Sequence, residues 1–151
     1  MKKIFLLIFL FAFIKGSFAQ DIIYKDGLYF KVQNLYSGKY FEYYENGSVK
    51  MEMNILNGRL ENETILYFEN GTKKEIRSYK EGKKNGTWIT WNEKGIKTAE
   101  AFYTMDKKDG KWTIWDDNGQ KRYEMFYSDG KKIGTWYMWN EHGELIMEKK
   151  Y

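Results

Sequence analysis

The stretch Gly86-Thr-Trp-Ile-Thr-Trp-Asn-Glu-Lys-Gly95 determines the fold, because its pattern recurs along the chain with a period of 24 residues. The glycine that closes the stretch recurs as Gly47, Gly71, Gly95, Gly119 and Gly143. The glycine that opens it recurs as Gly38, Gly86, Gly110 and Gly134, with Asn62 in the second unit. A fixed period of about 20 to 50 residues is the signature of a repeat architecture.

Aromatic residues follow the same period in three columns. The first column holds Trp88, Trp112 and Trp136, preceded by Tyr40 and Thr64. The second holds Tyr43, Tyr67, Trp91, Trp115 and Trp139, and the third holds Tyr79, Tyr103, Tyr127 and Tyr151, with Ile55 at its head. These residues are therefore repeat positions, and packing between repeats is the first explanation for them.

Each unit has the pattern of a β-hairpin. The run Thr87 to Trp91 is rich in β-branched and aromatic residues, and the run Lys121 to Tyr127 alternates in character, as strands do. Between two such runs lies a turn ending in glycine, such as Asn46-Gly47, in which both residues tolerate positive φ. A second polar connection, such as Asn57-Gly58, follows each unit. The sequence therefore predicts an all-β fold, an elongated array of antiparallel β-hairpin repeats.

The three-residue spacing between Trp88 and Trp91 leaves two arrangements open. Strict strand alternation places the two indoles on opposite faces, whereas a β-bulge between them changes that relation. In either case one hairpin is marginally stable alone, so we expect neighbouring hairpins to bury aromatic rings against one another.

The chain divides into a leader, an N-terminal capping hairpin and the repeats. The expected bounds are 1–19 for a signal peptide, 20–36 for the capping hairpin, and 37–60, 61–84, 85–108, 109–132 and 133–151 for five repeats. The capping hairpin is indicated by Asp26-Gly27, which falls outside the 24-residue register.

The leader has the features of a secretory signal. Lys2 and Lys3 precede an apolar run from Ile4 to Ile14, and Ser17-Phe18-Ala19 supplies small residues for a cleavage site. The run is shorter than the roughly 20 residues that span a bilayer, although an uncleaved anchor remains the alternative. We therefore expect cleavage near Ala19 and a secreted or periplasmic protein.

Charge and composition exclude several functions. Loss of the leader lowers the formal net charge from +4 to +1, and the lysines alternate with glutamates rather than cluster, so no nucleic-acid partner is expected. The chain has no cysteine and one histidine, and it lacks phosphate-binding or nucleophile motifs. We expect no metal, no cofactor and no enzymatic activity.

The ionisable residues that remain are also repeat positions. His142 occupies the position before a turn glycine, and we interpret it as a turn residue. Glu52, Glu100, Glu124 and Glu148 form one column on a strand face. Lys50, Lys74 and Arg122 are the basic residues expected to compensate this column across strands.

The unit Gly-x-Trp-x-x-Trp/Tyr-x-x-Asn-Gly, followed by a Lys/Glu strand that ends in Tyr, resembles the bacterial variant of the MORN repeat. The resemblance covers Ser37 to Tyr151. The opening Lys25-Asp26-Gly27-Leu28-Tyr29-Phe30 and the segment Ser37-Gly38-Lys39 resemble YwqK-type antitoxin proteins, which are built from these repeats. The resemblance implies an antitoxin-like role, which for an exported chain is of the immunity type.

We therefore expect an exported, non-catalytic scaffold for an unidentified protein partner. The alternative is a module that binds envelope glycan or a lipid surface. If one aromatic column faces outward, the best candidates for partner binding lie nearest the turn: Tyr43, Tyr67, Trp91, Trp115 and Trp139.

Overall fold

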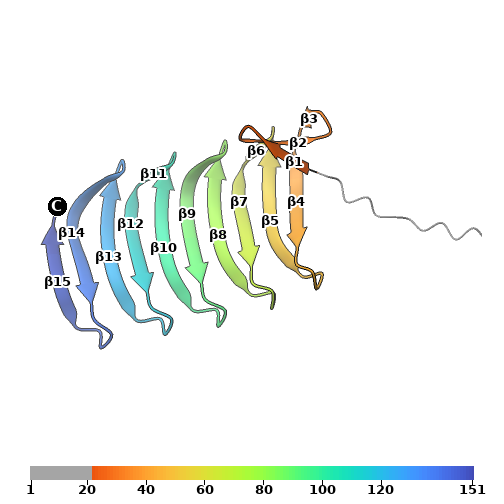
Figure 1. The fold of residues 1–151 in the computed structure, drawn as a ribbon. Helices are drawn as coiled ribbons and strands as arrows, with labels where there is room; N and C mark the ends of the chain where they lie inside the picture. Colours follow the sequence, from red (N-terminus) through yellow and green to blue (C-terminus); the bar gives the residue numbers. More distant parts are fainter. Residues whose placement is uncertain (1–21) are drawn as a thin grey trace, which may run out of the picture.

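A computed structural model describes residues 22–151, which form two antiparallel sheets and no helix (Figure 1). The predicted all-β class and the open array of hairpins are confirmed. The expected signal peptide, its cleavage site and the first residues of the capping segment lie outside the described residues.

The first sheet contains β1 (Ile22–Lys25), β2 (Leu28–Lys31) and β3 (Asn34–Leu35). The second contains β4 (Gly38–Tyr43), β5 (Val49–Leu56), β6 (Arg59–Leu60), β7 (Asn62–Tyr67), β8 (Lys73–Lys80), β9 (Lys83–Trp91), β10 (Lys97–Thr104), β11 (Lys107–Lys108), β12 (Gly110–Trp115), β13 (Lys121–Ser128), β14 (Lys131–Trp139) and β15 (Leu145–Lys150). Its strands follow one another in chain order from β4 to β15, with β6 paired to β5 and β11 paired to β10.

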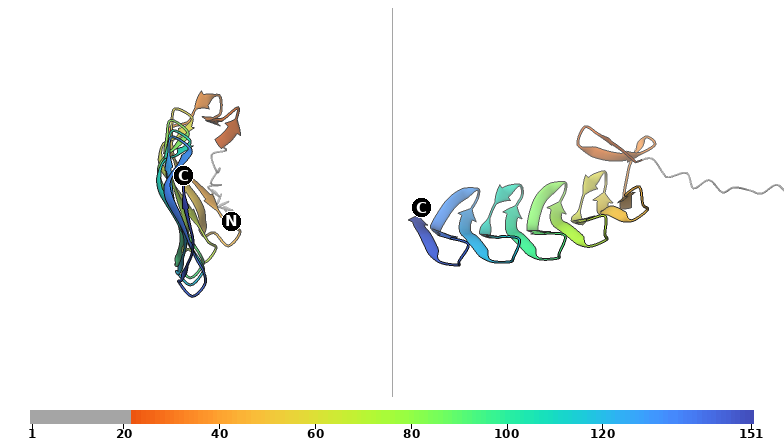
Figure 2. Two further views of the ribbon diagram at one scale, coloured as in Figure 1. Left: turned by 90° about the vertical axis from the view of Figure 1, so that its left-hand side faces the viewer. Right: turned by 60° about the horizontal axis from the view of Figure 1, so that its bottom comes forward.

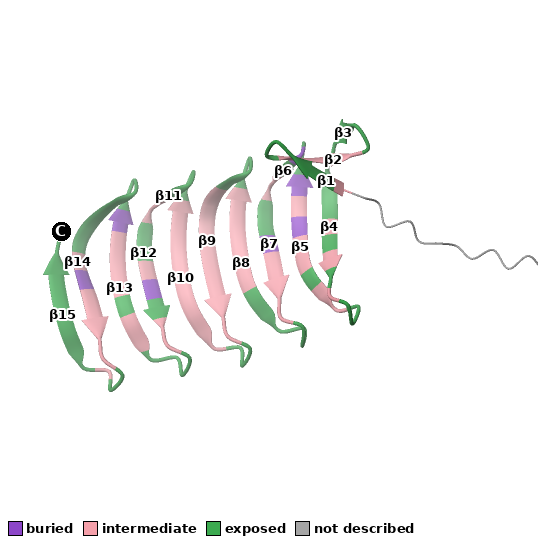
Figure 3. Cartoon of the chain, viewed as in Figure 1, coloured by how far each residue is buried: buried purple, intermediate pink, exposed green. Residues whose placement is uncertain are grey.

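The large sheet is a single layer, and the small sheet lies over only one end of it (Figure 2). Only four apolar side chains of the described residues are buried: Met53, Ile55, Tyr127 and Trp136. Most other strand positions are half-buried, as the burial colouring of Figure 3 shows. From β8 to β15, where the N-terminal sheet does not reach, both faces of the sheet are therefore accessible to a partner.

The five turns that end in the repeat glycines are not the two-residue hairpin turns that Asn-Gly indicates. Gly47, Gly71, Gly95, Gly119 and Gly143 have φ between 78° and 83°, but the residue before each has no positive φ. In the first of these turns the Gly47 amide donates to the Tyr44 carbonyl, and the Tyr44 amide donates to the Ser48 carbonyl. The expectation that both residues of Asn-Gly adopt positive φ is wrong here, because a longer loop needs only its last residue in the left-handed region.

Positive φ at two successive residues occurs instead at the second connection. The pairs are Asp26-Gly27, Asn57-Gly58, Glu81-Gly82, Met105-Asp106 and Asp129-Gly130. Two-residue hairpin loops need this conformation because it matches the twist of the flanking strands. The connection between repeats is therefore the tighter of the two turns.

Side-chain hydrogen bonds within the longer turns explain why Lys94 and His142 can replace asparagine. In the first turn the Asn46 side-chain oxygen accepts the Ser48 amide. In the third, Asn92 accepts the Lys94 and Ile96 amides, and in the fifth, Asn140 accepts the His142 amide. Once an Asn or Asp begins the turn, the position before glycine needs no polar acceptor.

The strand register places Trp88 and Trp91 on opposite faces of the sheet. Trp88 pairs with Ala101 and Trp91 pairs with Lys97, and the register shift between them lies on β10, between Lys97 and Ala99. The bulge is therefore on the facing strand, and β9 keeps its alternation.

The N-terminal sheet docks on the first repeats through backbone hydrogen bonds. The Tyr29 amide donates to the Gly58 carbonyl, and the Gly58 amide donates to the Tyr36 carbonyl. The large sheet is bowed, and the small sheet lies on its hollow side (Figure 2).

Candidate functional site

A continuous row of aromatic rings crosses one face of the large sheet. The rings belong to Tyr79, Trp88, Tyr103, Trp112, Tyr127, Trp136 and Tyr151. Successive ring centroids lie 4.6–5.7 Å apart and the ring planes are tilted against each other by 51–62°. We call this row the ring ladder and the face that carries it the aromatic face.

Tilted contacts of this kind add to the energy of burial, because the positive edge of one ring meets the negative face of the next. Tyr and Trp alternate along the ladder, so Tyr103 and Tyr127 each contact a tryptophan on both sides. The ladder links consecutive hairpins and supplies the apolar packing that a second sheet supplies in a β-sandwich. The expectation that rings pack between repeats is confirmed for these two columns.

Each ladder tryptophan is also fixed by a hydrogen bond. The indole N–H groups of Trp88, Trp112 and Trp136 donate to the carbonyls of Ser78, Phe102 and Phe126, at 3.0–3.2 Å. For Trp88 and Trp136 the acceptor lies at a shift in strand register beside Gly86 or Gly134, both of which have positive φ. The shift in strand register at the opening glycine therefore coincides with the carbonyl that accepts the indole hydrogen bond.

Three lysines with the same period lie against the ring ladder. The Lys84 ammonium is 4.7 Å from the Trp88 ring centroid and 5.0 Å from that of Tyr103. Lys108 lies likewise between Trp112 and Tyr127, at 4.4 and 4.9 Å, and Lys132 between Trp136 and Tyr151, at 4.5 and 4.8 Å. Each ammonium is therefore positioned by two rings through cation–π contact.

None of these three ammoniums has a carboxylate partner among the described residues. From β9 to β15, strand alternation and register place no Asp or Glu among the strand residues of the aromatic face. A further lysine, Lys149, lies over the Tyr151 ring at the last strand of the sheet. This half of the aromatic face is therefore cationic.

Burial in the ladder changes the acidity of its tyrosines. Removal from water raises the pKa of Tyr79, Tyr103 and Tyr127 above the ordinary value of 10.0. The positive charge of Lys132 opposes this effect at Tyr127, and that of Arg77 opposes it at Tyr79, but in both cases the pKa stays raised. These three phenols therefore keep their protons to a higher pH than an ordinary tyrosine does.

The ladder does not extend into the second repeat, where Thr64 holds the place of tryptophan. Thr64 is buried, and its hydroxyl has no hydrogen-bond partner. It pairs with Arg77, whose guanidinium lies 5.4 Å from the Trp88 ring centroid and is bound to Glu75 at 2.6 Å. In the second repeat the positive charge on the aromatic face, that of Arg77, is therefore neutralised by Glu75, whereas the lysines of the later repeats have no such partner.

Tyr29 of the N-terminal sheet covers part of this interrupted end. Its hydroxyl lies 3.6 Å from the Met53 sulfur, and Met53 is only 2% exposed. Burial also raises the pKa of Tyr29, with smaller effects from Tyr24 and Tyr79. The open part of the aromatic face therefore begins at the ring ladder.

The opposite face carries a lateral row that includes Glu52, Glu100, Glu124 and Glu148, and we call it the carboxylate face. The basic partners of this row differ from those expected. Glu52 pairs with Lys39, Glu100 with Lys97 and Glu124 with Lys121, at 2.5–3.4 Å. Lys50 and Arg122 instead contact Glu42 and Asp116, and Lys74 lies over the Phe68 ring.

The aromatic column proposed for partner binding lies on the carboxylate face near the turns. Tyr43 is 60% exposed, whereas Tyr67, Trp91, Trp115 and Trp139 are half-buried. Lys97 lies over the Trp115 ring and Lys121 over the Trp139 ring, at 5.6 and 5.0 Å. Each of these two rings therefore contacts a lysine that is already paired with a glutamate.

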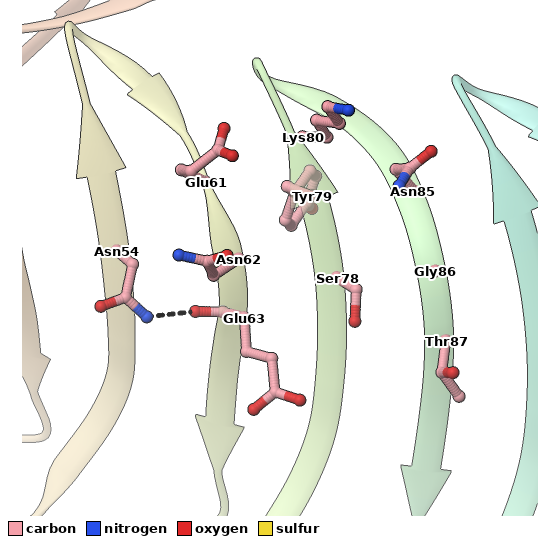
Figure 4. A pocket seen from close by; sticks show the side chains of 10 residues that line it. All are labelled: Asn54, Glu61, Asn62, Glu63, Ser78, Tyr79, Lys80, Asn85, Gly86 and Thr87. Atoms are coloured by element: carbon pink, nitrogen blue, oxygen red, sulfur yellow. Dashed lines mark hydrogen bonds between the residues drawn. The ribbon is translucent and has the colours of Figure 1, made fainter.

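A polar depression of about 630 Å³ spans β5, β7, β8 and β9. Figure 4 shows its lining, in which the Asn54 amide donates to the Glu63 carbonyl. Asn62, Ser78 and Thr87 add further polar groups. The depression is open and lies where the second repeat departs from the glycine pattern.

Residues 22–151 contain no group of three His, Cys, Asp or Glu side chains arranged for a metal ion. Nor does this part of the chain form a helix that is long and apolar enough to cross a membrane.

The fold and its faces define a class of protein, the single-layer array of β-hairpin repeats joined by aromatic rings. Residues 36–57, 60–81 and 108–129 each match the MORN repeat variant model, so the chain carries MORN repeats. Repeats of this kind are generally non-catalytic modules that contact proteins or membrane lipids. No curated protein matches the chain.

Lys84, Lys108 and Lys132 are not among the site residues predicted from the sequence. The signal was present, because these lysines share the 24-residue period and each stands two residues before a repeat glycine. Strand pairing places each one opposite a ladder tyrosine, and this relation appears only in the folded sheet.

Proposed function

We propose that this chain is a non-catalytic scaffold that binds one protein partner along the aromatic face of its sheet. The observation that carries the proposal is the exposed single-layer sheet, whose regular ring ladder and unpaired lysines extend over three consecutive hairpins. Surfaces rich in Trp and Tyr supply much of the binding energy at protein interfaces.

The proposal includes export and an immunity-type role. Export is supported by the signal-like leader, with cleavage near Ala19 and a periplasmic or secreted location. The immunity-type role is supported by the resemblance of residues 25–30 and 37–39 to antitoxin proteins of this repeat type. In this role the partner is a toxin that the scaffold covers.

Repeats of this type also bind membrane lipids, and stacked aromatic rings bind glycans. The class of partner must therefore be tested directly. The test is an affinity capture from envelope and secreted fractions with the tagged full-length protein, analysed by mass spectrometry and by assays for lipid and glycan. We expect one stoichiometric protein partner, and N-terminal sequencing of the exported protein should begin near Gln20.

Capture of glycan or lipid without any stoichiometric protein would overturn the protein-scaffold proposal. Recovery of the protein with its leader intact would overturn the export part alone. A variant with Trp115→Ala and Trp139→Ala tests the carboxylate-face column separately, because these rings lie on the side opposite the ring ladder.

A further inference from the structure

We propose that the aromatic face binds an acidic segment of the partner in the polyproline-II conformation, with one carboxylate against each of Lys84, Lys108 and Lys132. This inference rests on the proposed function and names the chemistry of the partner. It depends on three features of the described residues: charge, spacing and the aromatic floor.

The charge of the site requires an anionic ligand. Lys84 and Lys108 are half-buried against the rings, and they and Lys132 have no ion pair. Ring faces replace only part of the hydration that a half-buried ammonium loses. A carboxylate that approaches from the open side supplies the missing interaction, and the lack of acidic strand residues on this half of the face leaves room for it.

The spacing of the lysines matches a polyproline-II helix. Equivalent lysines are two strands apart, which corresponds to about 9.5 Å across the sheet. A polyproline-II helix has three residues per turn and rises about 9.3 Å per turn, so every third side chain lies on one side with nearly this repeat. In an α-helix, side chains return to the same side at a similar distance only after seven residues, which rise about 10.5 Å. In an extended strand, side chains three residues apart point to opposite sides.

The aromatic floor suits the same ligand. Proline-rich helices bind in grooves lined by aromatic rings, and they lose little conformational entropy on binding. The ladder from Trp88 to Tyr151 supplies such a lining, with a lysine above each Trp–Tyr pair. The hollow curvature of this face suits a rod-like segment and opposes close contact with a flat bilayer (Figure 2).

The test uses the purified protein and an acetylated, amidated peptide of four Pro-Pro-Glu triplets, with binding measured by calorimetry at low salt. Two control peptides are a Pro-Pro-Gln peptide of equal length and a peptide of the same composition with its four glutamates in one block. We expect binding of the regular acidic peptide alone, and weaker binding as salt rises.

The site variant replaces Lys84, Lys108 and Lys132 with methionine, which keeps an unbranched chain over the rings and removes the charge. The matched control makes the same change to methionine at Lys83, Lys107 and Lys131, each of which directly precedes a site lysine. Strand alternation directs these three side chains to the carboxylate face. We expect the site variant to raise the Kd about tenfold or more, because three charge contacts are lost, and the control to change it less than about twofold.

Near-UV circular dichroism checks that the ring ladder is intact in both variants, and Lys108→Met alone serves if the triple variant does not fold. Equal loss of affinity in the site and control variants, no binding of the regular peptide, or equal binding of the blocked peptide would each overturn the inference. Binding of anionic phosphatidylserine vesicles but not of the peptide would assign the lysines to a lipid surface instead.

The captured partner separates the two proposals. If a stoichiometric partner binds the site variant as well as it binds the natural sequence, the scaffold function stands and the acidic-segment inference fails. If no protein partner is captured, the scaffold function itself fails.

Discussion

At the scale of single residues, the opening glycine and the tryptophan two positions later act as one unit. Gly86 has φ of 100°, and the Trp88 indole donates to the Ser78 carbonyl on the neighbouring strand. Asn62 adopts φ of 59° where other units have glycine, which asparagine tolerates better than most residues. The second repeat therefore keeps a positive φ at this position, although Thr64 stands where the three later units have tryptophan.

The two glycines of the third unit should respond differently to alanine. A Cβ on Gly86 would lie 3.1 Å from the Ser78 Cβ, whereas a Cβ on Gly95 meets nothing within 4 Å. Both positions have positive φ, so Gly95→Ala should cost about 1 kcal/mol of unfolding free energy, and Gly86→Ala should cost about 1–3 kcal/mol more because of the close contact. Urea unfolding of both variants measures the difference, and equal losses would contradict the structural role of Gly86.

At the scale of elements, the N-terminal sheet covers the end of the array where the ring ladder is absent. Backbone bonds through Gly58 and the Tyr29–Met53 contact attach it to β5 and the following loop. A Cβ on Gly58 would lie 2.7 Å from the Leu35 side chain, so the attachment is close.

Removal of the Tyr29 ring should uncover Met53. In the natural sequence Met53 is 2% exposed, whereas Met147 on β15 is 36% exposed. In Tyr29→Ala we expect Met53 to be oxidised by peroxide several-fold faster, because loss of the ring opens its sulfur to solvent. Peptide mass spectrometry measures both residues, and Met147 is the internal control whose rate should not change. An unchanged Met53 rate would show that other parts of the small sheet protect it.

At the scale of the whole molecule, stability depends on a ladder of rings in place of an enclosed core. Among the described residues only a few side chains are buried, yet every hairpin from β8 to β15 contributes a ring to the ladder. Neighbouring repeats therefore stabilise one another, as expected of a linear array.

The ladder predicts a loss of stability in alkali. The raised pKa values of Tyr79, Tyr103 and Tyr127 mean that the folded chain holds protons that the unfolded chain has released above pH 10. The free energy of unfolding is therefore fully retained below about pH 10 and falls as the pH rises through the folded-state pKa values. Urea unfolding at pH 8 to 11, with absorbance at 295 nm to follow phenolate formation, checks this. Ionisation of Tyr79, Tyr103 and Tyr127 at the ordinary tyrosine pKa of 10.0 would contradict it.

The repeat, the all-β class and the identity of the recurring residues could all be predicted from the sequence alone. These features could be predicted because a 24-residue period and local turn chemistry are properties of neighbours along the chain. The turn type was assigned incorrectly, since Asn-Gly suits several loop lengths and the strand register selects among them.

Which aromatic columns contact each other depends on the pairing of strands in the folded sheet. Trp88 and Tyr103 come from different columns and form one ladder because β9 and β10 pair in a register that sets Gly86 opposite Tyr103. The same pairing positions Lys84 over both rings and leaves its ammonium without a carboxylate. The contacts that Tyr103 makes with Trp88 and Lys84 join residues distant along the chain. They depend on strand pairing and on the bulges that shift it, and a period along the chain does not fix either of these.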